Sequence, residues 1–377
     1  MSKNTKKILF IGNTAWSMYN FRREVFSAFL QKGYKVAVCA PYDKVFSEKL
    51  KDLGCDFYDI KLAAKGVNPV EDILLTFRFI MLFLRVKPDS IFCYTIKPNI
   101  YGSIAAFLTR IPSIAITTGL GYTFLSKNLI SWISKKLYKF AFLFPRKVWF
   151  LNRDDQDIFL SEKLVAVHKA EILNSEGINL DDFKPLENAS ANTGCVSFLL
   201  MARLLWDKGV GEFVEAAKIL KNKYPATRFS LLGFLGSNNP SAIPEEKLQE
   251  WVDNNYVEYL GTTEDVRSYI AKSDCVVLPS YYREGIPRSL MEGAAMGKIL
   301  ITTDSVGCKD TVDDQVSGFL CKVRDVESLT ACMEKVILMS PEERSGMGLA
   351  GRKKMEREFD MKYIINRYIN VLDSCKF

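Results

Sequence analysis

Short apolar runs rich in β-branched residues alternate with longer amphipathic segments along the chain. Each run is about five residues long, which suits a strand buried on both faces of a sheet, and each longer segment suits a helix that covers such a sheet. In the first half, the expected strands are Ile8–Ile11, Lys35–Ala40, Phe57–Ile60, Ser90–Cys93, Ser113–Thr117, Val148–Leu151 and Glu171–Leu173. This alternation is typical of a parallel sheet.

The alternation is interrupted once and then starts again. Residues Asp181–Gly194 lack periodicity and are rich in turn formers, so we interpret them as an interdomain linker. The strands expected after it are Val196–Met201, Arg228–Leu232, Val257–Leu260, Cys275–Leu278 and Ile299–Thr302. Helical segments close the chain at Val326–Met339, Pro341–Phe359 and Met361–Cys375. The sequence therefore predicts an α/β protein with two doubly wound, Rossmann-like domains, residues 1–180 and 195–358, facing across a cleft, and a final helix at 359–377 that packs back on the first domain.

Composition agrees with a globular protein and limits its partners. The chain has 377 residues, 48% of them hydrophobic and 25% charged, enough for two domains of ordinary size. The formal charge of +7 is a modest excess, and we expect no nucleic-acid partner. The nine cysteines are scattered and show neither zinc nor disulfide spacing, which favours a reducing cytoplasm.

Six of the 51 basic residues fall in one aromatic-rich segment without acidic residues, Lys127–Trp149. Lysines there alternate with Trp, Phe and Leu, a pattern that favours an anionic membrane surface. The longest apolar stretch, Ile73–Val86, is interrupted by Arg78 and is too short to cross a bilayer. We therefore expect peripheral membrane association. The alternative is that both stretches are ordinary core helices with basic outer faces.

The segment Pro279–Glu292 has the most informative chemistry. It directly follows an expected strand, and ligands of doubly wound folds bind beyond the carboxyl ends of the strands. Glu284 precedes a glycine turn, and Glu292 is expected two turns into the next helix on roughly the same side, so that two carboxylates can bind two sets of hydroxyls. The residues expected around a phosphate are Gly285, Ile286, Pro287, Arg288 and Ser289. The alternative is a surface helix with two solvated glutamates.

Two cations follow another expected strand. Arg203 and Lys208 lie between Val196–Met201 and the next helix, where they can neutralise a diphosphate and stabilise it as a leaving group. The alternative is a charge pair at the start of that helix. Near the N-terminus, Gly12, Asn13 and Thr14 follow the first strand, and their amides can meet an anion before the next helix, which is expected to begin near Asn20 to Arg23. The G-x-G-x-x-G pattern is missing there, which counts against a nicotinamide or flavin site.

Together these motifs resemble retaining glycosyltransferases of the GT-B fold, family four. The shared features are Arg203 with Lys208, Glu284 and Glu292 with seven residues between them, Gly285-Ile286-Pro287, and a closing helix near Phe359. Three further segments resemble the branch that builds capsular, O-antigen and glycoprotein sugars on polyprenyl diphosphate carriers. These segments are Thr95–Ser103, Thr118–Tyr122 and Asn174–Asn179.

The resemblance implies a UDP-sugar donor and a polyprenyl diphosphate-linked acceptor at the cytoplasmic face of the inner membrane. It implies that Arg203 and Lys208 hold the donor diphosphate, that Glu284 contacts the donor sugar, and that Glu292 binds the ribose hydroxyls. Gly261 would lie near the base. Gly12, Asn13, Thr14, Thr118 and Gly119 would line the acceptor side of the cleft. The expected reaction is transfer of α-linked N-acetylgalactosamine or another N-acetylhexosamine, without metal or cofactor.

One position departs from the family. Many relatives have a histidine before the glycine that matches Gly119, where this chain has Thr118. The sole histidine, His168, is expected at the surface, so a histidine base or a His metal triad is excluded by count. Thr118, Glu176 and Asn152 stay open as replacements for the contacts of that histidine.

Two other classes of function are possible. A GT-B epimerase would release inverted sugar from a UDP-sugar alone, and a phosphorylase of this fold would need a pyridoxal lysine that no motif marks. A non-catalytic scaffold of a glycan assembly would not need the complete set of Arg203, Lys208, Glu284 and Glu292, so that set argues for an enzyme.

Overall fold

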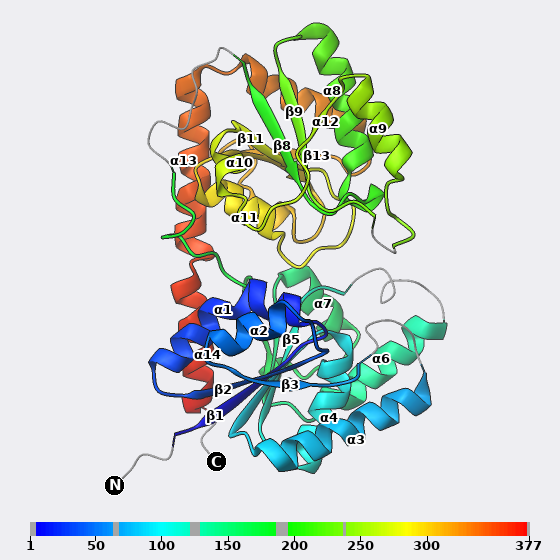
Figure 1. Ribbon diagram of the computed structural model, residues 1–377, viewed down its shortest axis with the longest axis vertical. Helices are drawn as coiled ribbons and strands as arrows, with labels where there is room; N and C mark the ends of the chain where they lie inside the picture. The colour runs from blue at the N-terminus through cyan, green and yellow to red at the C-terminus, as the bar shows by residue number, and fades with distance from the viewer. Residues whose placement is uncertain (1–4, 63–67, 121–128, 186–194, 237–238, 375–377) are drawn as a thin grey trace. The chain divides into compact units, whose positions relative to one another are not determined.

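The computed structural model describes residues 5–62, 68–120, 129–185, 195–236 and 239–374 (Figure 1). The chain divides into two compact units, one formed by residues 1–177 with 361–377 and the other by residues 178–360. Each unit is built on one sheet whose strands pair in parallel. The alternation of apolar runs and amphipathic segments therefore predicted the fold class correctly as two doubly wound α/β domains.

Unit 1 has a seven-stranded sheet in the order β3-β2-β1-β4-β5-β6-β7. Its strands are β1 (Lys7–Ile11), β2 (Lys35–Ala40), β3 (Asp56–Asp59), β4 (Ser90–Tyr94), β5 (Ser113–Thr117), β6 (Lys147–Phe150) and β7 (Ala170–Ile172). Its helices are α1 (Ala15–Gln31), α2 (Phe46–Asp52), α3 (Pro69–Val86), η1 (Pro98–Gly102), α4 (Ser103–Leu108), α6 (Leu129–Ala141), α7 (Arg153–Ser161), η2 (Val167–Lys169) and α14 (Met361–Ser374). The winding direction changes between β1 and β4, and sheets of this kind bind ligands at such a switch point.

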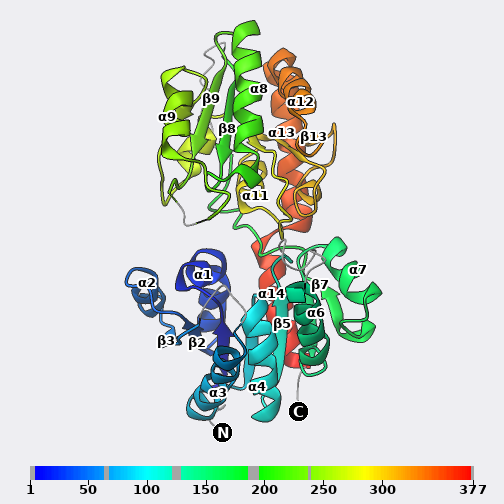
Figure 2. The same ribbon diagram turned by 90° about the vertical axis from the view of Figure 1, so that its right-hand side faces the viewer.

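Two helical layers cover the faces of this sheet. Over one face, α3, α4 and α6 lie side by side (Figure 2), and Phe79 and Phe83 of α3 pack with Leu9 of the sheet. The other face carries α1 and α14. Tyr368 of α14 is buried there, with its ring centroid 5.1 Å from aromatic rings in both β4 and β6 and its hydroxyl 2.8 Å from that of Tyr94. Residues far apart in sequence thus complete one core.

Unit 2 has a six-stranded sheet in the order β10-β9-β8-β11-β12-β13. Its strands are β8 (Ser197–Met201), β9 (Arg228–Leu232), β10 (Glu258–Tyr259), β11 (Cys275–Leu278), β12 (Ile299–Thr303) and β13 (Gly318–Cys321). Its helices are η3 (Trp206–Lys208), α8 (Val210–Lys223), α9 (Glu245–Asp253), α10 (Arg267–Ala271), α11 (Arg288–Ala295), η4 (Lys309–Thr311), α12 (Val326–Leu338) and α13 (Pro341–Glu358). Alternate residues of β8 face opposite layers: Phe198 packs with α8, α9 and α12, and Leu199 packs with α10, α11 and α13.

The predicted set of elements needs two corrections. The short strand β13 was not predicted, because its four residues include a glycine and no β-branched side chain. The first helix was expected near Asn20 but begins at Ala15, because the Thr14 side chain caps it by accepting a hydrogen bond from the Ser17 amide at 3.1 Å.

The predicted linker lies only partly within the described residues. Residues 186–194 fall outside them, as do Tyr122 of one motif and Lys127 of the basic segment. The residues before 186 pack in unit 2, because the Arg352 guanidinium of α13 donates hydrogen bonds to the carbonyl oxygens of Leu180 and Phe183. In the described part of the chain, no helix combines the length and apolar character needed to cross a membrane.

Candidate functional site

The loop between β8 and α8 holds the two predicted cations. Two buried leucines anchor the loop, Arg203 is exposed, and Lys208 ends η3. Gly209 follows with φ of 75°, and a Cβ atom there would lie 2.1 Å from the carbonyl oxygen of Pro279. Only glycine therefore fits where the loop after β8 touches the loop after β11.

Asp207 joins these loops through its main chain. Its carbonyl oxygen accepts hydrogen bonds from two successive amides of the loop after β11, each at 3.1 Å, and lies 3.1 Å from the Ser280 hydroxyl. The carbonyl oxygen of Ser280 in turn accepts hydrogen bonds from the hydroxyls of Thr303, the last residue of β12, and of Ser305 beyond it. The loops that follow β8, β11 and β12 are therefore bonded together at the carboxyl edge of the sheet.

Lys208 and Glu284 form an ion pair between two of these loops. The Lys208 Nζ donates to the Glu284 Oε1, and only 13% and 14% of the two side chains are exposed. The Ser280 hydroxyl lies 3.2 Å from the same carboxylate oxygen, and the Lys208 Nζ lies 5.0 Å from the centroid of the Tyr282 ring. The structure thus brings together two of the three residues predicted to be catalytic. The third, Arg203, is in the same loop as Lys208.

The ion pair affects Asp207, a residue that the motif analysis did not single out. Burial raises the pKa of the Asp207 carboxyl, the charge of Lys208 opposes that rise, and the charge of Glu284 adds to it. Within the described residues, the buried Asp207 Oδ1 has no hydrogen-bond partner. The available signal in the sequence was its position beside Lys208 in a loop at the carboxyl edge.

The start of α11 corrects the predicted relation between the two glutamates. Ile286 precedes Pro287, and a residue before proline is disfavoured in a helix, so α11 begins only at Arg288. Glu292 is therefore one turn into the helix and not two. Its Oε1 accepts a hydrogen bond from the Arg288 Nε at 2.8 Å. Helical periodicity does not relate Glu292 to Glu284, which precedes the helix.

The turn before α11 offers backbone groups to an anion. Its N-cap residue, Pro287, makes no side-chain capping bond, so no N-cap side chain covers the first helical amides. Ile286 and Ser289 beside it are half-buried. A Cβ atom on Gly307 would lie 2.1 Å from the Gly285 carbonyl oxygen, which means that the loop after β12 packs directly on this turn.

Gly261, the residue predicted near the base, follows β10 at the same edge of the sheet. Its carbonyl oxygen accepts a hydrogen bond from the Gly233 amide at 2.8 Å, and the Tyr259 hydroxyl donates to the Gly233 carbonyl at 3.0 Å. A Cβ atom on Gly233 would lie 1.7 Å from the Ala202 carbonyl oxygen. The loops after β8, β9 and β10 therefore also meet, so all the residues predicted to bind the donor lie at one edge of unit 2.

The residues predicted for the acceptor side lie at the carboxyl edge of the unit 1 sheet. They are Gly12, Asn13 and Thr14 after β1, and Thr118 and Gly119 after β5. The amide of Gly12 donates to the Cys39 carbonyl at the end of β2, and Gly119 has φ of 123°. Since β1 and β5 both neighbour β4, these two loops share one edge of one sheet.

Two family models match the chain. One, described as "Glycosyl transferase 4-like", matches residues 7–152, and the other, described as "Glycosyl transferases group 1", matches residues 196–338. The protein is a glycosyltransferase with a group 1 domain. The second match spans Arg203, Lys208, Glu284 and Glu292, so the candidate site of this glycosyltransferase lies within the matched region.

Relatives and solved structures agree with this family. The N,N'-diacetylbacillosaminyl-diphospho-undecaprenol alpha-1,3-N-acetylgalactosaminyltransferase of Campylobacter jejuni is 28% identical over 97% of this chain and 98% of that protein. The UDP-Gal:alpha-D-GlcNAc-diphosphoundecaprenol alpha-1,3-galactosyltransferase of Escherichia coli is 24% identical over 72% of each. A Rickettsia africae glycosyltransferase superposes with a TM-score of 0.82 at 18% identity over 98% of both chains. Anabaena HepE in complex with UDP and glucose superposes with a TM-score of 0.78 at 17% identity, over 98% of this chain and all of that chain. These structural likenesses confirm the predicted GT-B fold.

Three residues were considered as replacements for the histidine that this glycosyltransferase lacks. Two of them, Glu176 and Asn152, make contacts within unit 1 that support the fold. Glu176 pairs with the buried guanidinium of Arg22 at 2.5 Å, and Asn152 caps α7 by accepting a backbone hydrogen bond at 2.8 Å. Thr118 is half-buried after β5, and its role stays a prediction. His168 is exposed on η2, as expected.

The described part of the glycosyltransferase holds no group of three His, Cys, Asp or Glu side chains that could bind a metal. Its eight described cysteines are free thiols, and seven of them are buried. Burial raises the pKa of the Cys308 thiol to about 11, which keeps it protonated at neutral pH. Catalysis without metal or cofactor stays a prediction.

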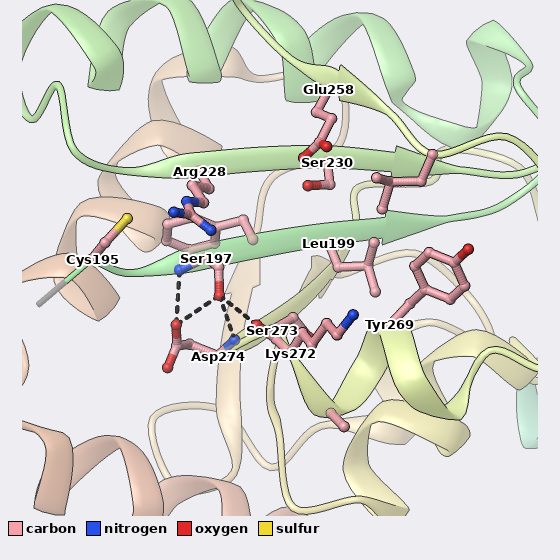
Figure 3. Close-up of a pocket in the computed structure, with 13 residues that line it drawn as sticks. Cys195, Ser197, Leu199, Arg228, Ser230, Glu258, Tyr269, Lys272, Ser273 and Asp274 are labelled. Atoms are coloured by element: carbon pink, nitrogen blue, oxygen red, sulfur yellow. Dashed lines mark hydrogen bonds between the residues drawn. The ribbon is translucent and has the colours of Figure 1, made fainter. Parts of the chain in front are cut away.

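A cavity of about 440 Å³ lies elsewhere in unit 2 (Figure 3). It begins at the amino ends of β8, β9 and β11, where the amide and the hydroxyl of Ser197 both donate to the Asp274 Oδ2 at 2.8 Å. Arg228 and Glu258 add charged groups to its lining. The cavity reaches Leu260, next to Gly261, but its lining includes none of the residues predicted to bind the donor.

Proposed function

We propose that this glycosyltransferase moves a sugar from a UDP-sugar to a saccharide carried on a polyprenyl diphosphate, with retention of the anomeric configuration. The contact between Lys208 and Glu284 is the observation that supports the donor site most directly, because it joins a cation and a carboxylate next to the uncapped start of α11. The acceptor is suggested by the relatives from C. jejuni and E. coli, whose names specify undecaprenyl diphosphate-linked saccharides.

In this proposal, cations and backbone amides bind the donor diphosphate. Lys208 and Arg203 neutralise its charge, and the amides around Gly285–Ser289 donate hydrogen bonds to it. Negative charge grows on the departing UDP as the sugar–phosphate bond breaks, so the same groups stabilise the transition state more than the bound donor. The departing diphosphate accepts the proton of the acceptor hydroxyl on the face where the new bond forms.

Donor binding requires Lys208 to change partner. Its ammonium is engaged with Glu284 in this structure, and a diphosphate competes for it as the more highly charged anion. The Glu284 carboxylate then accepts hydrogen bonds from hydroxyls of the donor sugar. Glu292, which Arg288 orients, is assigned to the ribose hydroxyls, and Gly261 to the neighbourhood of the base.

The donor sugar we propose is an N-acetylhexosamine, with α-linked N-acetylgalactosamine as the first choice. The name of the C. jejuni relative supports this choice at 28% identity. The product would belong to a capsule, an O-antigen or a glycoprotein glycan. The reaction would take place in the cytoplasm at the inner membrane, where such carriers present their diphosphate, and without a metal.

A panel of UDP-sugars with a synthetic polyprenyl diphosphate monosaccharide tests the proposal. One donor should extend the acceptor by the mass of a single sugar, and the coupling constant of the new anomeric proton should report an α linkage. Each UDP-sugar is also incubated without acceptor. Free inverted sugar in that control would favour an epimerase, and a panel that yields no extended product would reject the transfer reaction.

A further inference from the structure

The outer side of α3 is apolar along its whole length, where a surface helix normally carries charges. Ile73, Phe77, Met81 and Leu84 are between 53% and 71% exposed. They recur every three or four residues, so they lie along one side of the helix. The opposite side is buried against the sheet through residues such as Phe79. A second apolar side is not needed to hold α3 on unit 1.

The neighbouring helices continue this apolar surface. Figure 2 shows α3, α4 and α6 side by side over one face of the sheet, and α3 packs against α4. Phe107 of α4 and Phe140 of α6 are both exposed, and both touch the Phe144 ring, at 4.4 Å and 5.2 Å between centroids. Trp132 of α6 is also exposed. We call the following residues the apolar surface of unit 1: Ile73, Phe77, Met81, Leu84, Phe107, Trp132 and Phe140.

The most exposed charged residues on these three helices are basic. The charged residues of α3, α4 and α6 that are exposed as whole residues are all basic, namely Arg85, Lys136 and Lys139, whereas the Glu71 side chain is 45% exposed and pairs with Arg78. The two acidic residues, Glu71 and Asp72, lie in the first turn of α3 and pair with basic side chains. Apolar side chains together with exposed cations match an anionic bilayer, which offers both acyl chains and phosphate groups.

We propose that the apolar surface of unit 1 docks on an anionic lipid bilayer, with the α3 side chains entering the acyl boundary and the α6 lysines reaching lipid phosphates. A bilayer fits better than a second copy of this chain, because a symmetric dimer would bring the same basic side chains against each other. The proposal deepens the proposed function, on which it rests for the idea that the acceptor is held in the same bilayer.

Vesicle flotation of the full chain tests this surface without any substrate. The protein should float with phosphatidylglycerol-containing vesicles and much less with pure phosphatidylcholine. The double substitution Ile73→Glu with Phe77→Glu should lower the partition coefficient at least about tenfold, because two apolar side chains no longer insert and two negative charges are added. The matched control is Ile219→Glu with Leu338→Glu, two comparably exposed apolar residues on unit 2, and it should float normally.

The basic residues are tested separately. Replacing Lys136 and Lys139 by Gln should lower the partition coefficient about fivefold for each lysine at low salt. This defect should disappear in high salt, where the unaltered protein also loses the electrostatic contribution. The defect of the α3 variant should remain in high salt, because insertion of apolar side chains is not screened.

Three results would overturn the proposal: no flotation of the unaltered protein with anionic vesicles, an equal loss in the unit 2 control, or a solution dimer that the α3 variant dissociates while flotation is unchanged. Sedimentation velocity provides the last measurement. Transfer to a short-chain acceptor that is soluble without vesicles separates this proposal from the proposed function. The α3 variant should keep that activity. Failure of transfer by a protein that floats normally would reject the proposed function and leave the docking surface supported.

Discussion

α3 and α13 are helices of the same length, but the outer side of α3 is apolar and that of α13 is charged. Both have 18 residues, and both begin with a capping side chain followed by proline, Asn68-Pro69 in one and Ser340-Pro341 in the other. α3 exposes Ile73 and its apolar neighbours, whereas α13 exposes charged residues such as Lys353. Since each helix is capped and packs on its sheet, the fold specifies only the inner side. The outer side of α3 therefore reflects what the helix meets outside the chain.

The two sides of α3 should respond very differently to the same change. Phe79→Ala empties a fully buried position and should lower the free energy of unfolding of unit 1 by about 3–5 kcal/mol. Phe77→Ala, two residues away on the exposed side, should change it by less than about 0.5 kcal/mol. Urea unfolding followed by circular dichroism measures both. Similar losses would mean that the outer side of α3 is packed against the protein.

The ion pair between Lys208 and Glu284 should matter for turnover more than an ordinary buried pair. Lys208→Ala or Glu284→Ala should lower kcat about 100-fold or more, equivalent to about 2.7 kcal/mol, because each removes a group that stabilises the transition state. The control is Lys354→Ala in α13, which breaks an ion pair of 2.8 Å to Asp313. It should lower stability and leave turnover per folded molecule unchanged. Normal turnover of the site variants would reject the assignment.

Two glycines of similar backbone conformation allow the energetic effect of the contact between the loops after β8 and β11 to be measured separately. Gly209 and Gly236 have φ of 75° and 82°, so Ala at either costs about 1–2 kcal/mol in the left-handed region. At Gly209 the added Cβ also meets the Pro279 carbonyl, whereas at Gly236 it meets no atom of the described residues within 4 Å. Gly209→Ala should therefore cost about 1–3 kcal/mol more in thermal unfolding and raise the donor KM. Equal losses of stability in the two variants would show that the loops move apart to accommodate the added Cβ atom.

The smallest expected effect concerns Asp207. Burial raises the pKa of its carboxyl above the ordinary value of 3.8, so the folded protein holds this proton more tightly than the unfolded chain. The carboxyl therefore lowers stability as pH rises from about 3.8 through the raised pKa, and the loss persists above it. Asp207→Asn removes this ionisation, so its stability relative to the parent protein should rise slightly as the pH rises over that interval. Melting temperatures measured from pH 3.5 to 7 test this; parallel curves would contradict it.

Most strands were predictable because a strand buried in a parallel sheet is a short apolar run. β5 and β9 have the predicted bounds, Ser113–Thr117 and Arg228–Leu232. β13 was missed because Gly318–Cys321 lacks the β-branched residues that such runs usually contain. The start of α11 could have been predicted from the sequence, because Pro287 disfavours helix at Ile286. The separation of eight residues between the two glutamates instead suggested an earlier start.

The candidate site residues could be named one by one from the sequence, but the contacts between them could not. Lys208 and Glu284 each follow a strand, yet no sequence pattern states that loops 76 residues apart place these two side chains in contact. Asp207 was missed for a related reason. It joins the loops through its carbonyl oxygen, which every residue has, so its side chain carries no signature of the contact.

The route of the chain into α14 determines the order in which the two units can be completed. Tyr368 fills the aromatic core of unit 1, although it is translated after every residue of unit 2. Unit 2 is continuous in sequence and can close soon after it leaves the ribosome. Unit 1 is synthesised first and finished last. Its aromatic face stays uncovered throughout translation of unit 2, when chaperones are the natural protection against aggregation.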